Sequence, residues 1–150
     1  KPEDNKKITA GSGIIHSEFN PSDKEPVHFL QIWIIPNMLD LRPSYEQKAF
    51  NRKSMTNRLT LLVSPDGHNG SLEIHQDAEI WQILLEENKD TEFAINHSRK
   101  IWIQVAEGSV STYEHLLVAG DGLAVSDEEG IIRLRGIDKL SNIIIFNLRA

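Results

Sequence analysis

The stretch RLTLLVSPDGHNGSLEIHQDAEIWQILL, residues 58–85, contains the pattern that decides the fold. Three short apolar runs in it are separated by turn signals. In Pro65-Asp66-Gly67, proline presets φ and glycine accepts a positive φ, and Asn69-Gly70 is a strong hairpin signal. The runs between these turns are Arg58–Ser64, Leu72–His75 and Ala78–Leu85. Short strands between closely spaced turns are typical of a β-sandwich or a β-barrel.

The same pattern continues on both sides of this stretch. We expect further strands at Val27–Ile35, Ile101–Val105, Leu116–Val118, Ile131–Leu134 and Ile143–Leu148. Isoleucine occurs 18 times and alanine only 8 times, and a surplus of β-branched residues favours strands over helices. The sequence therefore predicts an all-β, jelly-roll type of fold. Val27–Ile35 carries almost no charge, which suggests that this strand is buried on both faces.

Composition excludes several classes of function. The chain has 150 residues, the length of one ordinary domain, and 16 basic against 22 acidic side chains give a formal charge of −6. This charge repels nucleic-acid backbones and anionic membranes, and no apolar stretch is long enough to span a bilayer. There is no cysteine, so only histidine and carboxylate side chains are plausible metal ligands. The absence of cysteine also fits a reducing compartment, and we expect a cytoplasmic protein.

His16-Ser17-Glu18 is the first candidate site. It follows the glycine-rich turn Ala10-Gly11-Ser12-Gly13. On an extended strand, residues two apart point to the same face, so the His16 imidazole and the Glu18 carboxylate can converge on one cation. The alternative reading is two exposed polar side chains.

Glu73, His75 and Asp77 form a second candidate set, because alternation places all three on one strand face. They would spread over about 13 Å along a straight strand at about 3.3 Å per residue, which is too far for one ion without a bulge. An amphipathic strand with its polar side in water predicts the same residues. The other histidines, His28, His68, His97 and His115, are isolated in the sequence and are expected to be packed or solvent-facing residues.

Longer matches identify a family. The segment ITAGSGIIHSEFNP (residues 8–21) resembles the pirin family, especially its bacterial quercetinase-like branch. The resemblance continues over most of the chain, through LQIWI (30–34), PSYEQ (43–47), SPDG (64–67), GSL (70–72), IHQDA (74–78), WIQVAEGSV (102–110), AGDG (119–122) and SDE (126–128).

The resemblance implies a bicupin, in which two cupin β-barrels face each other and the N-terminal barrel holds one metal through three histidines and one glutamate. His16 and Glu18 match the last two of these ligands. The first two would come from an H-x-H motif that precedes them, and no two histidines here are separated by one residue. The chain also begins at Lys1 without an initiator methionine. We therefore expect the C-terminal part of such a protein, lacking most of the first cupin.

We accordingly expect three parts: residues 1–35 as the end of an N-terminal cupin carrying half a metal site, 36–58 as a linker, and 59–150 as a C-terminal cupin. The stretch His97–Val110 would be this second cupin's version of the ligand-bearing hairpin. His97 stands there alone where a pair of histidines is needed, so the second cupin is expected to be metal-free.

The resemblance also implies an activity for the intact protein: metal-dependent dioxygenation of a flavonol such as quercetin. The metal would be a divalent transition ion (Fe, Ni, Cu, Mn or Zn), with Glu18 as a ligand and as the base that takes the flavonol hydroxyl proton. The chain alone would bind metal weakly or not at all and would be inactive. The rival hypothesis is a non-catalytic regulatory or binding module of the pirin type.

A final expectation concerns partners. If the preceding strands are absent, the apolar segment 27–35 has an unpaired backbone edge, which is a pairing liability. We expect this segment to pair with another copy, to bind a cleaved N-terminal fragment, or to fold back along the C-terminal cupin.

Overall fold

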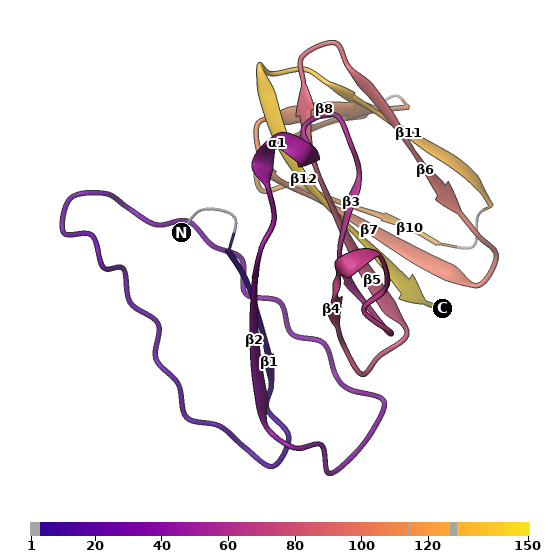
Figure 1. The fold of residues 1–150 in the computed structure, drawn as a ribbon. Helices are drawn as coiled ribbons and strands as arrows, with labels where there is room; N and C mark the ends of the chain where they lie inside the picture. The colour runs from indigo at the N-terminus through magenta and orange to yellow at the C-terminus, as the bar shows by residue number, and fades with distance from the viewer. Residues whose placement is uncertain (1–3, 114, 127–128) are drawn as a thin grey trace.

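The structure is a computed structural model and describes residues 4–113, 115–126 and 129–150. These residues form three antiparallel or mixed sheets and almost no helix (Figure 1). The elements, in chain order, are β1 (Asp4–Thr9), β2 (Ser44–Ala49), α1 (Arg52–Met55), β3 (Thr60–Ser64), η1 (His68–Gly70), β4 (Leu72–Glu73), β5 (Ala78–Glu86), β6 (Asp90–Ile95), β7 (Arg99–Glu107), β8 (Ser109–Thr112), β9 (His115–Val118), β10 (Gly122–Val125), β11 (Gly130–Gly136) and β12 (Leu140–Arg149). The prediction of an all-β chain is confirmed.

Two sheets stack to form a sandwich from residue 60 onward. The larger sheet has the strand order β10-β7-β12-β5-β3-β4, and the smaller has the order β6-β11-β8-β9. Side chains from both sheets fill the space between them and are almost fully buried. This core consists of Ile83, Leu85, Phe93, Ile95, Ile101, Ile103, Val105, Val110, Leu117, Ile132, Leu134, Ile143 and Ile145.

The alternation of side chains along β7 shows why this sequence folds as a sandwich. Ile101, Ile103 and Val105 are at most 2% exposed and face the other sheet. Trp102 and Gln104 lie between them and face outward, where Trp102 is 39% exposed. A strand with one apolar row buries that row against a second sheet, and burial of such side chains is the main stabilising term.

The chain between β3 and β4 turns twice rather than once. Asn69-Gly70 predicts a hairpin, but Asn69 lies in the short helix η1 with a positive φ of 53°, and β3 and β4 pair in parallel. The Ser71 amide donates to the His68 carbonyl (3.1 Å), which closes this second turn. The hairpin prediction is wrong because the turn at Pro65–Gly67 has already reversed the chain.

Residues 36–58, expected to be a linker, contain regular structure. β2 pairs with β1 over its whole length, and α1 places Met55, which is 3% exposed, against Leu62 and Leu84 on the larger sheet. The Lys48 ammonium donates to the Gly70 carbonyl and so connects this two-stranded ribbon to η1. The pattern of apolar runs did not reveal β2 because its side chains are mostly polar and exposed. The three-part division of the chain itself stays a prediction.

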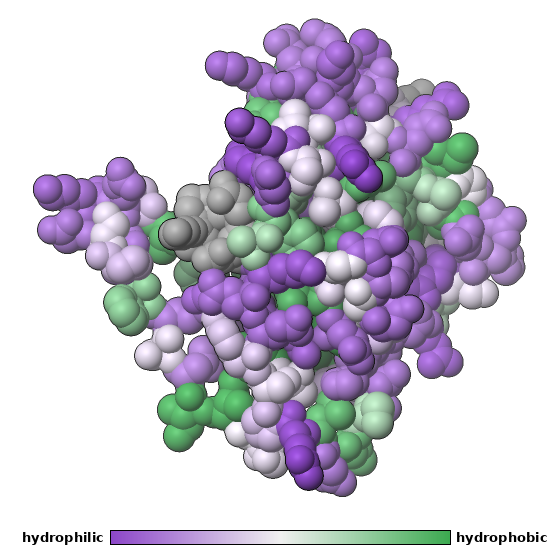
Figure 2. Space-filling model, in the orientation of Figure 1, coloured by the Kyte–Doolittle hydropathy of each residue, from purple (hydrophilic) through white to green (hydrophobic). Residues whose placement is uncertain are grey.

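The segment Val27–Ile35 is not a strand, and the prediction that both of its faces are buried is wrong. Trp33 is 86% exposed and Ile35 is 84% exposed. A strand needs a partner for its backbone, and none of the described strands pairs with this segment. Figure 1 shows that it belongs to the long connection from β1 to β2, which forms two wide loops. Hydrophobic side chains lie exposed among hydrophilic ones on this part of the surface (Figure 2).

Candidate metal half-site

The turn after β1 determines where the predicted ligands lie. The Gly13 amide donates to the Ala10 carbonyl (2.8 Å), and Gly11 has a φ of 53°. A Cβ atom at Gly11 would lie 2.1 Å from the Leu41 carbonyl oxygen, so only glycine fits at this position. The turn sends the chain back alongside β1 and places residues 14–19 in an irregular, exposed segment.

His16 and Glu18 are both exposed on this returning segment. A Glu18 carboxylate oxygen lies 3.8 Å from the Lys6 ammonium on β1, and the Glu18 side chain keeps 38% of its surface exposed. Among the described residues, no hydrogen bond or ion pair engages the His16 ring. The segment therefore offers one imidazole and one carboxylate, the latter beside a competing cation.

These two donors do not form a complete metal site. Within residues 4–113, 115–126 and 129–150 there is no group of three or more histidine, aspartate or glutamate side chains that could hold an ion. Protein sites for transition metals use three or four such ligands. The residues present here therefore do not fit a resident metal, although their donor types are those that such a metal takes.

Glu73, His75 and Asp77 do not share a straight strand face. β4 ends at Glu73, and the chain bends through the following residues. The Asp77 carboxylate instead accepts a hydrogen bond from the Arg99 guanidinium (2.7 Å), and the Arg99 Nε donates to the Asn147 side chain (2.8 Å). Of the three residues, Asp77 thus belongs to a polar connection from the start of β5 to β7 and β12.

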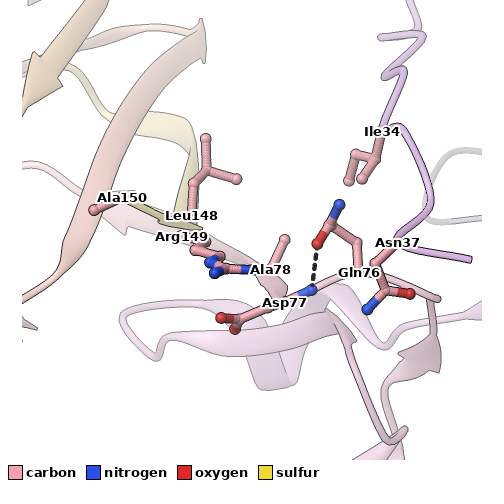
Figure 3. Close-up of a pocket in the computed structure, with 8 residues that line it drawn as sticks. All are labelled: Ile34, Asn37, Gln76, Asp77, Ala78, Leu148, Arg149 and Ala150. Atoms are coloured by element: carbon pink, nitrogen blue, oxygen red, sulfur yellow. Dashed lines mark hydrogen bonds between the residues drawn. The ribbon is translucent and has the colours of Figure 1, made fainter.

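Two shallow pockets separate the N-terminal connection from the sandwich. The first, of about 350 Å³, lies between residues 34–37 and the ends of β5 and β12 (Figure 3). The Gln76 side chain connects the two sides of this pocket. It donates a hydrogen bond to the Ile35 carbonyl (2.7 Å) and accepts one from the Asp77 backbone amide (2.8 Å). The Asn37 amide donates to the His75 carbonyl (2.8 Å).

The second pocket has a similar volume, about 350 Å³, and is more apolar. Residues 30–34 form one wall, and the outward row of β7 and β12 forms the other, with Trp102, Phe146 and Leu148. In the single chain, segment 27–35 therefore lies along the outer face of the C-terminal sandwich. This is the third of the three arrangements expected for it.

The Asp66 carboxylate and the His68 imidazole are in contact, which the sequence pattern did not predict. The His68 Nδ1 atom lies 2.5 Å from an Asp66 carboxylate oxygen. Hydrogen bonds from the His68 side chain and backbone lower the pKa of Asp66 from 3.8 to about 2. The signal for this contact is the two-residue spacing of Asp66 and His68 within a tight turn.

His97 and His28 are solvent-facing, one of the two expected environments, and each lies near a glutamate. The His97 Nδ1 atom lies 2.6 Å from a Glu129 carboxylate oxygen, and the His28 Nδ1 atom lies 4.0 Å from Glu107. His97 occupies the turn between β6 and β7, where the predicted second ligand-bearing hairpin lies. Asp127 and Glu128, the last two residues of the SDE match to the family, lie outside the described residues.

The fold defines a class: an all-β cupin protein. Residues 61–148 match the family model described as quercetinase C-terminal cupin domain, and residues 1–34 match the model described as pirin. The chain belongs to the pirin family, through its quercetinase-type C-terminal cupin domain. The family resemblance and the cupin fold predicted from the sequence are confirmed.

Individual relatives agree with this assignment. Quercetin 2,3-dioxygenase of Escherichia coli (strain K12) is 38% identical over 141 residues, which cover 94% of this chain and 59% of the relative. The crystal structure of the bacterial pirin YhhW from Escherichia coli, in complex with nickel(II), matches with a TM-score of 0.88 and 35% identity over 98% of this chain and 62% of YhhW. YhaK from Escherichia coli, at 24% identity and a TM-score of 0.61, shares the fold. The chain thus spans about three fifths of the length of the quercetin 2,3-dioxygenase and of YhhW, and about half of that of YhaK.

In the part of the chain that the structure describes, no helix is both long and apolar enough to cross a membrane.

Proposed function

We propose that this chain is the C-terminal cupin, with the adjoining half of a metal site, of a bicupin flavonol dioxygenase of the quercetinase type. The observation that supports this most is the exposed His16-x-Glu18 pair, directly after the glycine turn, in a chain of the pirin family. The Escherichia coli relative carries the name of that activity, and YhhW binds nickel in its crystal structure. A cytoplasmic location is part of the proposal and rests on the absence of cysteine.

His16 and Glu18 would act together with two further histidines supplied by a segment N-terminal to Lys1. A transition metal bound by such a set supplies open coordination positions for dioxygen chemistry. Glu18 would also have a role of its own, apart from the chemistry that the metal supplies. Glu18 presents an exposed carboxylate that can accept the hydroxyl proton of a flavonol, provided that the Lys6 ammonium releases it.

The C-terminal sandwich would contribute packing rather than chemistry. Its interior, as far as it is described, is filled with aliphatic and aromatic side chains from both sheets. Such a core leaves no space for a substrate between the sheets. Its outer face, with Trp102 and Phe146, already lies against residues 30–34 of the N-terminal part.

A second candidate function is a non-catalytic regulatory or binding module. The incomplete donor set favours it for the 150-residue chain alone, because two ligands hold a metal too weakly for a resident cofactor. Under this hypothesis, restoring the missing ligands would give metal binding without dioxygen consumption.

Dioxygen uptake with quercetin separates the two functions. The 150-residue chain, supplied in turn with Fe²⁺, Ni²⁺, Cu²⁺, Mn²⁺ and Zn²⁺, is expected to show no turnover. A chimera that places the N-terminal residues of the Escherichia coli relative before Lys1 is expected to consume dioxygen. In that chimera, Glu18→Gln should reduce turnover at least about a hundredfold, the usual range for an acid–base group.

Glu73→Gln is the matched control, because Glu73 is another exposed glutamate, at the end of β4. Turnover by the 150-residue chain itself would contradict the half-site proposal. A chimera that binds metal stoichiometrically but consumes no dioxygen would favour the regulatory module.

A further inference from the structure

Residues 74–77 form a strap that connects the end of β4 to the start of β5 without regular secondary structure. The Ile74 amide donates to the Ser64 carbonyl at the end of β3 (2.9 Å). The amide of Ala78, the first residue of β5, donates to the Gln76 carbonyl (2.9 Å). The path of the strap is therefore set at both ends by the larger sheet.

The strap makes two hydrogen bonds to the N-terminal connection. The Gln76 Nε2 atom donates to the Ile35 carbonyl (2.7 Å), and the His75 carbonyl accepts from the Asn37 amide (2.8 Å). A second bond orients the Gln76 side chain, because its Oε1 atom accepts from the Asp77 backbone amide (2.8 Å; Figure 3). How firmly the connection is held therefore depends on the position of the strap.

Arg99, the first residue of β7, holds the last residue of the strap. Its Nη1 atom donates to the Asp77 carboxylate (2.7 Å), its Nε atom to the Asn147 side-chain oxygen (2.8 Å) and its Nη2 atom to the Asn147 carbonyl (2.9 Å). Only 17% of the Arg99 side chain is exposed. A planar guanidinium engaged in three such bonds has a fixed orientation, so Arg99 ties the strap to β12.

The position of Arg99 is in turn set by the sandwich. The Asn147 side-chain nitrogen donates to a Glu79 carboxylate oxygen (3.0 Å), and the Trp81 indole nitrogen donates to the same oxygen (3.0 Å). The Trp81 ring packs edge-on against Phe93 of the smaller sheet, with ring centroids 6.1 Å apart. A series of contacts therefore runs from the core to the strap, and its members hold one another in place.

We propose that Arg99 controls how firmly residues 35–37 are held against the sandwich, although it has no bond to them. Within the described residues, the hydrogen bonds and the ion pair of the Arg99 side chain all lead to the strap or to β12. Arg99 acts by fixing Asp77, whose backbone amide orients Gln76. Loosening this end of the sandwich therefore releases the connection. The inference does not involve the candidate metal half-site and is independent of the proposed function.

Chymotrypsin cleavage within residues 29–39 of the 150-residue chain measures this attachment. Arg99→Met removes the contact with Asp77 and should speed cleavage by about two- to fivefold, the effect of losing one partly exposed ion pair. It should also speed hydrogen exchange at the Asn37 amide. Arg133→Met is the matched control, because it breaks an arginine–glutamate pair (2.8 Å) on the smaller sheet and should change neither rate.

A double variant with Gln76→Met separates this mechanism from a general loosening of the sandwich. If Arg99 acts through Gln76, Arg99→Met adds nothing to the rate of Gln76→Met, whereas independent effects multiply. Asp77→Ala leaves the bonds between Arg99 and Asn147 in place and should give the same increase as Arg99→Met. It therefore provides the test if Arg99→Met does not fold. An unchanged rate in either folded single variant, or multiplied rates in the double variant, would overturn the inference.

Discussion

The Lys6 ammonium and the Glu18 carboxylate lie 3.8 Å apart across the turn at residues 10–13. The proposed metal ligand is thus neutralised by a cation on the neighbouring strand. A metal ion that binds Glu18 competes with this partner. The pair accordingly lowers the metal affinity of a site that already has only two donors.

Replacing the lysine should raise metal affinity slightly. An exposed ion pair contributes about 0.2–1 kcal/mol, so Lys6→Gln should tighten Ni²⁺ binding by up to about fivefold in calorimetric titration. Glu18→Gln should abolish the binding, and Lys24→Gln, at another exposed lysine, should leave it unchanged. A stoichiometric metal that survives dialysis against chelator in the unaltered chain would show that its ligand set is complete.

The Asp66–His68 pair should make stability depend on pH in the acid range. The pKa of Asp66 is about 2 in the folded chain and 3.8 as its ordinary value, so the folded state favours the ionised form. This contribution is fully present above about pH 4 and is lost as the pH falls toward 2.

Urea unfolding midpoints provide the measurement. At pH 6 the unaltered chain should unfold at a higher urea concentration than Asp66→Asn. This difference in midpoint should shrink steadily between pH 4 and pH 2. Asp138→Asn, at an exposed aspartate, is the control. An advantage that grew as the pH fell would contradict the assigned contact.

Gly108→Ala should destabilise the sandwich strongly. Gly108 has a φ of 75°, and an added Cβ would lie 2.7 Å from the Ser141 Oγ and 2.8 Å from the Leu140 carbonyl oxygen. Ser141 Oγ also accepts from the Ser109 amide (3.1 Å) and donates to the Ser109 carbonyl (2.7 Å), so the clash would disturb a buried connection between the sheets.

Gly120→Ala is the matched control, because Gly120 has a φ of 95° but nothing lies within 4 Å of an added Cβ. Both variants carry backbone strain of order 1–3 kcal/mol, and only Gly108→Ala adds the clash. Thermal unfolding should therefore show that Gly108→Ala lowers the free energy of unfolding by about 1–3 kcal/mol more than Gly120→Ala does, in the range of overpacked cores. Equal losses would refute the argument.

Gln76 should hold the N-terminal connection against the sandwich. Its side chain donates to the Ile35 carbonyl (2.7 Å), and a hydrogen bond of this kind contributes about 1 kcal/mol. Gln76→Met, which cannot donate, should speed chymotrypsin cleavage within residues 29–39 by about fivefold. Glu73→Met should not change the rate. An unchanged rate in Gln76→Met would mean that other contacts hold the segment.

The sandwich was largely predictable, because its central strands bury an alternating apolar row. Ile143 and Ile145 on β12, like Ile101 and Ile103 on β7, belong to apolar runs that the sequence shows directly. β6 (Asp90–Ile95) was missed because half of its residues are polar, and only Phe93 and Ile95 enter the core. β8 was missed because its buried positions include Ser109 and Thr112.

The candidate site was predictable only as a motif. The sequence places His16 and Glu18 two residues apart, but it does not show that Lys6 pairs with Glu18 or that the segment is exposed. Trp33, expected in the core, is exposed for a related reason. Whether residues 27–35 form a strand depends on a partner for their backbone, and no local pattern contains that information.

The position of β12 between β5 and β7 has a consequence for synthesis on the ribosome. Ala78 at the start of β5 pairs with Leu148 near the end of β12. The two halves of the larger sheet therefore cannot join until the whole of β12 has left the exit tunnel. Until then β5 and β7 expose apolar rows and unpaired edges, a state that favours aggregation and binding by chaperones. A nascent chain that stopped before Leu140 would lack the shared strand and could not close this sheet.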